Sequence, residues 1–315
     1  MGAYVVRRLL IIPFTLLLIS VVVFIFMRAV PGDAADVRCG AAGNFDAKCF
    51  EVVREELGLN ENKVGQYFKW LGDIVLRGDF GYSLSQRNHV NDELLERIGK
   101  TAQIGVLAIA FTLLIGVPVG MVSAVRAGKF SDYVLRFLAV IGLSVPGFWI
   151  ATLIVIFPPV WWGMRIAPDY VGWGDPLGHL RVIAIPAFVI ALAGGGTIAR
   201  IVRSSMLEVL RSDQVRTARA KGLREFAVIS RHVFRPSMIA LFTIIGLQFG
   251  LVLGGSVIME SIFNIQGIGL WVLSASVERD FVIIQAVSVV FASWFLLITL
   301  IVDVAYAWID PRIRY

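Results

Sequence analysis

At residues 213–223 the chain reads Asp213-Gln214-Val215-Arg216-Thr217-Ala218-Arg219-Ala220-Lys221-Gly222-Leu223, the centre of a polar stretch that runs from Arg211 to Pro236. A glycine directly after a short helical run, with a lysine before it, is typical of a helix end, so the run 215–221 is predicted to end at Gly222. Phe226, Ile229 and Val233 then recur at helical spacing up to Pro236. The stretch therefore predicts two short helices joined by a glycine turn.

Strongly apolar sequence lies on both sides of this stretch and accounts for most of the chain. Hydrophobic residues make up 57% of its 315 residues. Apolar runs of about 20 residues match the thickness of a bilayer core, which predicts an integral membrane protein. The net charge of +6 does not indicate nucleic-acid binding, because the basic residues gather in alternate loops and no base-stacking motif accompanies them.

Six segments are predicted to cross the membrane as helices. The first could instead be a signal peptide, but its apolar run is long for one and no small-residue cleavage site follows at 28–33, so an uncleaved span is expected. The predicted spans are Leu9–Met27, Ala102–Val125, Phe137–Pro158, Val182–Ile201, Ile239–Met259 and Val282–Ala305.

The segment between the first two spans is polar and is predicted to form a small helical cap. Its apolar residues fall on helical faces. One face has Val64, Tyr67, Phe68, Leu71 and Val75, and another has Leu94, Leu95 and Ile98. Cys39 and Cys49, the two cysteines of the chain, both lie here. They are expected to form a disulfide if the cap is outside the cytosol; two free thiols are the alternative, and a metal pair lacks further ligands.

Loop charges predict the orientation of the chain in the membrane. Basic residues concentrate on one side and are sparse in the short loops of the other, which by the positive-inside rule places both termini in the cytosol. The basic side has Arg7, Arg8, Arg126, Lys129, Arg136, the 211–235 stretch, Arg312 and Arg314; the other side has Arg165, Arg181 and Arg279.

Residues 213–223 resemble the EAA loop of bacterial ABC importer permeases of the dipeptide/oligopeptide branch, which often reads Asp-Tyr-(Ile/Val)-Arg-Thr-Ala-Arg-Ala-Lys-Gly-Leu. Arg216-Thr217-Ala218 stands where the founding Glu-Ala-Ala would be. Three further segments resemble the same branch: Gly78–Ser83, Ser144–Phe148 and the Asp310-Pro311-Arg312 tail. Residues 263–269 depart from it, since Gln266 replaces the usual proline.

The resemblance implies an all-α membrane protein with the type I importer permease (MetI-like) fold and an extracytoplasmic cap between spans one and two. The expected organisation is residues 1–30 for the N-terminus and first span, 31–101 for the cap, and 102–315 for a five-span core with a cytosolic coupling loop at 205–238. The implied partners are a homologous second permease, two ATPase subunits that bind ATP and Mg²⁺, an extracytoplasmic solute-binding protein and the lipid membrane of a bacterial cell.

The resemblance also implies that the coupling residues contact an ATPase subunit. They are Asp213, Val215, Arg216, Thr217, Ala218, Arg219, Lys221, Gly222 and Leu223. Here Ala218 is expected to permit close approach to a groove on the ATPase, while Arg216, Arg219 and Lys221 pair with its acidic residues. The alternative is a solvated loop whose arginines only set topology, which leaves the helix break at Gly222 without a role.

No catalytic or metal site is expected in this chain. Its histidines are scattered, and Gly128-Lys129 is followed by Phe130, so it is no phosphate-binding loop. Ser144, Gln248 and Glu260 are candidates for the translocation path, with Glu260 just past the outer end of span five. The small residues of spans four and five, at 194–196, 246, 250, 254 and 255, favour close packing, with the path as the alternative.

The function predicted is the permease subunit of an ATP-driven, binding-protein-dependent importer of di- or oligopeptides, and not an enzyme. Nickel and oligosaccharides are alternative solutes within the branch. A secondary transporter or channel working without ATPases is the alternative mechanism. It would normally need ionisable groups deep in the membrane, and the span interiors have few.

Overall fold

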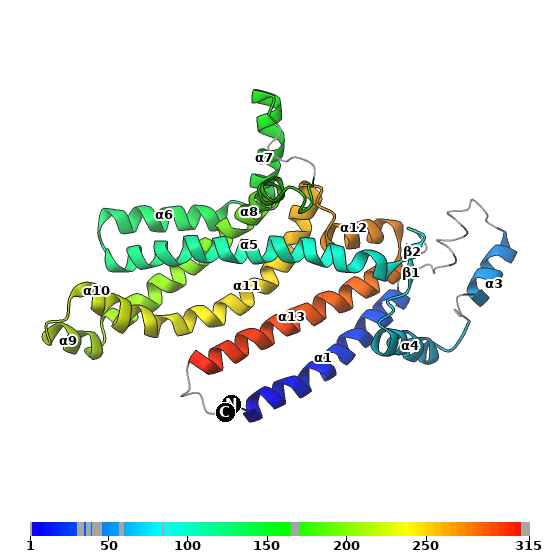
Figure 1. The fold of residues 1–315 in the computed structure, drawn as a ribbon, viewed down its shortest axis with the longest axis horizontal. Helices are drawn as coiled ribbons and strands as arrows, with labels where there is room; N and C mark the ends of the chain where they lie inside the picture. Colours follow the sequence, from blue (N-terminus) through cyan, green and yellow to red (C-terminus); the bar gives the residue numbers. More distant parts are fainter. Residues whose placement is uncertain are drawn as a thin grey trace. The chain divides into compact units, whose positions relative to one another are not determined.

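The computed structural model describes residues 2–29, 35, 39, 46–56, 60–83, 85–164 and 170–309 (Figure 1). Nearly all of these residues are helical, as the sequence predicted. The chain divides into two compact units, one of residues 1–100 and 266–297, the other of residues 101–265 and 298–315. Each unit is described separately below.

The first unit contains the first span, the cap and most of the last span. Its elements are α1 (Gly2–Ala29), α3 (Ala47–Glu56), α4 (Lys63–Gly72) with a π-helical end (Asp73–Arg77), β1 (Tyr82–Ser83), β2 (Asn88–His89), the start of α5 (Val90–Val125), α12 (Ile268–Glu278) and most of α13 (Phe281–Ile309).

The second unit contains the remaining spans and the polar stretch. Its elements are the rest of α5, α6 (Phe130–Ser144), α7 (Gly147–Trp162), α8 (Pro176–Leu210), α9 (Asp213–Ala220), α10 (Glu225–Ala227), the π-helical stretch η2 (Val228–Phe234), α11 (Arg235–Ile262) and the end of α13.

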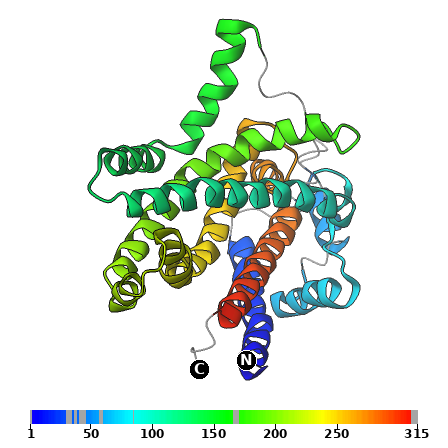
Figure 2. The same cartoon turned by 60° about the vertical axis from the view of Figure 1, so that its left-hand side comes forward.

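Five helices among the described residues are long and apolar enough to span a membrane, namely α1, α5, α8, α11 and α13. The third predicted span, Phe137–Pro158, is not one helix. It is the pair α6 and α7, which meet at 84° and count as a sixth span if taken together. In Figure 2, α7 turns sharply away from α6.

Pro146 explains this break. A proline disfavours helical angles in the residue before it, and Val145 is extended, with φ −86° and ψ 121°. Pro146 is the N-cap of the next helix, α7, which starts at Gly147. A proline at a helix start loses no intrahelical hydrogen bond, because the first N–H groups of a helix have no partner within it. The predicted third span is therefore a bent pair of helices, and apolar length alone does not indicate the bend.

The predicted boundary between cap and second span, at residue 101, does not coincide with a helix end. Leu94, Leu95 and Ile98, expected in a cap helix, belong to α5, which runs unbroken from Val90 to Val125. Its 36 residues are about 54 Å long, well beyond the ~30 Å core of a bilayer. The cap therefore continues directly into the second span.

The cap contains a two-stranded hairpin that the sequence analysis did not predict. Tyr82 pairs with His89 and Ser83 with Asn88 in the antiparallel strands. The buried carboxylate of Asp280 accepts hydrogen bonds from the Ser83 hydroxyl (2.7 Å) and from the backbone N–H (3.1 Å) and hydroxyl (2.8 Å) of Ser85. Asp280 thus fastens the hairpin to the α12–α13 turn within the first unit.

Two further contacts order the cap. The Tyr67 hydroxyl lies 2.9 Å from the Ser20 hydroxyl, and its ring packs edge-on against Phe24, which holds α4 on the C-terminal half of α1. Cys39 and Cys49 form a disulfide with a Cα–Cα distance of 6.2 Å. Closing so short a loop contributes about 2–3 kcal/mol in the loop-entropy model.

Glycines allow close helix packing in the second unit, as predicted for span four. A Cβ added at Gly196 would lie 2.5 Å from the Ala139 carbonyl oxygen of α6, and one at Gly194 would lie 2.8 Å from the Thr112 hydroxyl of α5. The prediction does not hold at Gly254 and Gly255, where an added Cβ meets no described atom within 4 Å.

Candidate functional site

The polar loop, defined here as residues 211–235, begins with helix α9. Its first turn contains Asp213, where a negative charge interacts favourably with the helix dipole. The Arg216 guanidinium lies 3.2 Å from this carboxylate, and the Thr217 hydroxyl donates to the Asp213 carbonyl at 2.9 Å. These local bonds stabilise an eight-residue helix that would be marginal in isolation.

Gly222 ends α9, as the sequence predicted. Its φ is +77°, an angle that side chains with a Cβ adopt at a cost. The Gly222 N–H donates to the Arg219 carbonyl (2.9 Å) and the Leu223 N–H to the Ala218 carbonyl (3.4 Å), the two bonds of a Schellman motif. The chain therefore changes direction at Gly222, whose backbone N–H is hydrogen-bonded.

An ion pair closes the turn. The Arg219 guanidinium donates from Nη2 to Glu225 Oε1 at 2.6 Å and from Nε to Glu225 Oε2 at 3.2 Å. This contact lowers the pKa of the Glu225 carboxyl and raises the pKa of Arg219. Arg219 was expected to pair with an acidic residue of an ATPase subunit. In this structure it pairs with Glu225 of the same loop.

The inward face of α9 packs on the rest of its own chain. Val215 and Ala218 are buried in an apolar cluster with Met206 of α8 and Val228 and Val233 of η2. The expectation that Ala218 approaches a groove on another subunit is therefore wrong in its direction. Its small side chain permits close packing of α9 against its own chain, which fixes α9 to the ends of α8 and α11.

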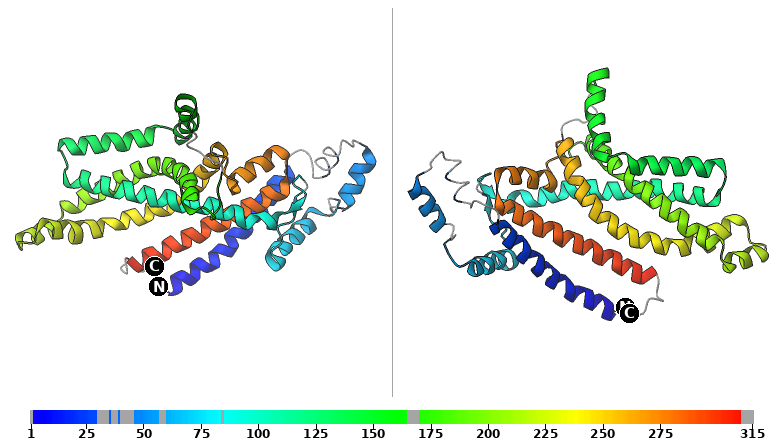
Figure 3. Two further views of the ribbon diagram at one scale, coloured as in Figure 1. Left: turned by 45° about the horizontal axis from the view of Figure 1, so that its top comes forward. Right: turned by 180° about the vertical axis from the view of Figure 1, so that it is seen from behind.

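The outward face of the loop is basic, with two apolar residues at its tip. The sequence from 211 to 235 has seven basic and two acidic residues. Arg216, Thr217 and Lys221 are exposed, and so is part of Leu223. Phe226 is 85% exposed. Figure 3 shows α9 and α10 from two sides, at the far end of α8 and α11.

Phe226 is a candidate contact residue that the sequence analysis missed. It recurs with Ile229 and Val233 at helical spacing, but it is exposed, and Val228 and Val233 form the buried face of this segment. An aromatic residue set among charges directly after a glycine turn was the available signal. Exposed aromatic and basic residues are enriched in interface hot spots.

The loop continues into α11 without the stop predicted at Pro236. Phe234 and Arg235 have helical angles, and Pro236 occupies the first turn of α11, where its missing N–H is tolerated. The Ser237 hydroxyl donates to the Val233 carbonyl at 3.0 Å. Movement of the loop can therefore pass into a membrane span through continuous helical backbone.

The three predicted path residues lie apart. Ser144 is exposed at the α6–α7 break, and Gln248 is buried in α11, 3.4 Å from the Gly194 carbonyl. Glu260 is fully buried inside α11, not beyond its end, and accepts from the Thr101 hydroxyl at 2.7 Å. None of the three lines either of the two cavities described below.

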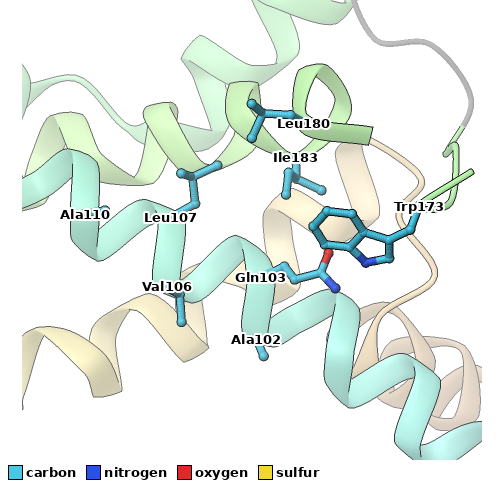
Figure 4. Close-up of a pocket in the computed structure, with 8 residues that line it drawn as sticks. All are labelled: Ala102, Gln103, Val106, Leu107, Ala110, Trp173, Leu180 and Ile183. Atoms are coloured by element: carbon cyan, nitrogen blue, oxygen red, sulfur yellow. The ribbon is translucent and has the colours of Figure 1, made fainter. Parts of the chain in front are cut away.

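A cavity of about 350 Å³ lies between α5 and α8 in the second unit (Figure 4). Apolar side chains line most of it, and the Gln103 amide and Trp173 face one another at one end. Trp173 covers the buried His179, whose ring nitrogens lie 2.8 Å from the Val171 carbonyl and 2.6 Å from Gln103 Oε1. The histidine is thus a bonded interior group and not an available metal ligand.

The described residues contain no group of three or more His, Cys, Asp or Glu that could hold a metal ion. What the loop offers is a rigid, basic surface with an exposed aromatic residue.

The sequence of this chain is similar to those of known proteins. Residues 116–315 match the family "Binding-protein-dependent transport system inner membrane component", and residues 1–105 match its N-terminal family. The chain is 36% identical over 301 residues to a protein named as a peptide transport system permease of Brucella abortus (strain 2308), covering 95% of each chain. It is 35% identical over 314 residues to the glutathione transport system permease protein of Escherichia coli (strain K12), covering 99% of each.

Solved structures share the fold. The inward-facing MetNI methionine ABC transporter matches with a TM-score of 0.55 at 17% identity, covering 69% of this chain and 96% of that one. An amino acid ABC transporter matches with a TM-score of 0.51 at 15% identity, covering 70% and 93%. The all-α, six-span type I importer fold expected from the sequence is confirmed.

Proposed function

This chain belongs to the binding-protein-dependent transport system inner membrane components and is the permease subunit of an ABC importer, and from that premise we propose that it imports di- or oligopeptides. The peptide assignment is supported by the relatives named for peptide and glutathione transport. Nickel and oligosaccharides are the alternatives that a transport assay must exclude.

The observation that carries the proposed mechanism is the polar loop. It is a short helix with an apolar inner face fixed to α8 and α11 and a basic, partly aromatic outer face. In the proposal this outer face binds an ATPase subunit. Arg216 and Lys221 pair with acidic groups on that subunit, and Leu223 and Phe226 enter an apolar groove there.

The proposed assembly contains a second, homologous permease, two ATPase subunits and an extracytoplasmic solute-binding protein. ATP and Mg²⁺ are held by the ATPase subunits, so hydrolysis takes place outside this chain. The protein is a multi-pass inner-membrane protein. The basic loops support an orientation with both termini and the polar loop in the cytosol and the cap outside.

In the proposed cycle, closure of the ATPases on ATP pushes α9, and the continuous helix from η2 into α11 transmits the movement to the membrane. ATP must bind the closed arrangement more tightly than the open one, because a ligand shifts an equilibrium only by its differential affinity. The spans then open outward and accept solute released by the binding protein, which docks on the cap and the loop after α7.

Reconstitution tests the proposal. The chain is purified from its native membrane with its co-eluting subunits and placed in liposomes with the binding protein, and uptake of a labelled dipeptide is followed with and without ATP. Uptake that needs both ATP and the binding protein is expected. Uptake by the isolated chain without any ATPase would establish a secondary transporter or channel instead, and uptake of Ni²⁺ but not of peptide would replace the solute.

A further inference from the structure

A second cavity in the second unit, of about 270 Å³, combines apolar walls with arginines. It lies among α5, α6 and α8, and Val119, Leu135 and Leu143 are among its apolar lining residues. Arg136, Arg200 and Arg203 line it as well. A site with hydrocarbon walls and three guanidinium groups suits a ligand that is itself part apolar and part anionic.

One carboxylate is bonded to residues that line this cavity, and its own bonding capacity is used. Asp132 is buried and accepts from Arg203 Nε and Nη2, both at 2.9 Å, from the Ser123 hydroxyl at 2.6 Å and from the Gly128 N–H at 3.0 Å. Arg136 Nε lies 3.4 Å from the same carboxylate. One negative charge thus faces three positive ones, which leaves an excess of positive charge.

Arg200 is the arginine with capacity to spare. The described residues place no carboxylate within ion-pair distance of it, and its side chain is exposed. It precedes the end of α8 at Leu210 by ten residues, about 15 Å along a helix that is about 52 Å long. Such a position suits the headgroup boundary, because α8 is longer than the ~30 Å hydrocarbon core.

The rim of the cavity is apolar surface of the kind that faces lipid. Val140, which lines the cavity, is exposed, as is Phe137 one turn before it on α6. A hydrocarbon chain can therefore leave the cavity directly into the bilayer. Basic pockets between membrane helices are sites where anionic lipid headgroups bind.

We propose that this cavity binds the headgroup of an anionic phospholipid such as phosphatidylglycerol. The phosphate accepts hydrogen bonds from the Arg200 guanidinium and from the Ser204 hydroxyl, and the first methylenes of one chain lie along Val119 and Leu143. The volume admits a headgroup and the start of a chain, and the remaining hydrocarbon stays in the membrane. The bound lipid ties α6 to α8 next to the turn at Gly128.

Native mass spectrometry of the solubilised, delipidated importer tests this, with phosphatidylglycerol added back and phosphatidylcholine and inorganic phosphate as separate additions. The wild-type complex is expected to retain phosphatidylglycerol at this site and to release phosphatidylcholine. Arg200→Gln is expected to bind phosphatidylglycerol about tenfold more weakly, since it removes a charge-assisted hydrogen bond to phosphate. Arg200→Lys keeps the charge without the fork and should lie between the two.

Arg181→Gln is the matched control. It makes the same charge change on the same helix, 19 residues away and at the opposite end of α8, and should leave retention unchanged. Equal retention by Arg200→Gln and wild type would overturn the proposal, as would displacement of the lipid by an equal concentration of inorganic phosphate. A cross-link from Val140→Cys to another protein subunit in the native membrane would also overturn it, by making this face a protein interface. Lipid retention is measured without transport. The lipid proposal can therefore hold even if the chain does not import peptides.

Discussion

Arg219 and Glu225 form a two-pronged ion pair across the Gly222 turn, with N–O distances of 2.6 and 3.2 Å. The pair joins the last turn of α9 to the first residue of α10 and so fixes the angle between them. Because both side chains are about half exposed, its free energy is limited by solvent screening to about 0.2–1 kcal/mol. In the proposed mechanism this pair helps to keep α9 and α10 at their angle while the ATPase subunit pushes on the loop.

Substitution and charge exchange at this pair should show that the two residues act together in transport. Arg219→Gln and Glu225→Gln are each expected to lower ATP-driven uptake and substrate-stimulated ATPase activity while assembly persists. The charge exchange Arg219→Glu with Glu225→Arg should recover part of the loss. No recovery, with assembly intact, would mean that Arg219 acts on the partner subunit and not within the loop.

The ion pair also predicts a pH dependence of loop stability. Arg219 lowers the pKa of the Glu225 carboxyl from 4.5, so the stabilisation is complete above pH 4.5 and is lost as the pH falls through the lowered value. Hydrogen exchange of the α9 amides, measured from pH 6 downward and corrected for intrinsic rates, should show loss of protection only on the acid side. Glu225→Gln should make that acid step smaller.

The glycine turn gives a matched pair of substitutions. Gly222→Pro cannot reach φ +77° and removes the N–H bonded to Arg219, so it should leave the permease in the membrane but abolish coupled uptake. Gly222→Asn should retain coupling, because asparagine tolerates positive φ and the structure has room for a Cβ. Wild-type uptake and ATPase stimulation in Gly222→Pro would remove the turn from the mechanism.

Phe226 is expected to anchor the ATPase subunit. Phe226→Ala should weaken co-purification of that subunit by about 1–3 kcal/mol in binding free energy without changing the thermal stability of the permease alone. Phe130→Ala is the control, since Phe130 is 83% exposed against 85% for Phe226 but is the first residue of α6. Equal effects of the two substitutions would indicate a general loss of exposed apolar surface.

Substitutions on the inward side of α9 should lower the stability of the permease itself. Ala218→Leu overfills the contact with Met206 and Val233 and should destabilise the permease by about 1–3 kcal/mol. Ala220→Leu adds the same atoms on the exposed side of α9 and should leave stability unchanged. Thermal unfolding of the two variants in detergent measures the difference directly, and equal midpoints would contradict the packing.

The spans could be predicted from the sequence because apolar length indicates them, and the end of α9 because its positive φ favours a glycine. The bend between α6 and α7 depends on one proline, whose local effect an apolar count does not register. The direction of Phe226 depends on where the chain points after Gly222, and the position of Glu260 on how far α11 extends. These are consequences of tertiary packing, which periodicity within one segment does not contain.

The pairing within the loop could not be predicted for a related reason. Arg219 and Glu225 are six residues apart, a spacing that brings no two side chains together on a single helix. The Gly222 turn brings them into contact. Likewise, Ser83 and Asp280 are 197 residues apart, so no local pattern indicates that the hairpin is fastened to the α12–α13 turn.

The most direct test of the account replaces Thr217, on the outer face of α9, with photoreactive benzoylphenylalanine in the intact importer and identifies the cross-linked partner in native membranes. The account predicts a cross-link to an ATPase subunit that changes in yield when ATP is bound. A cross-link to the solute-binding protein, or labelling of position 217 only from the outside of the cell, would contradict it.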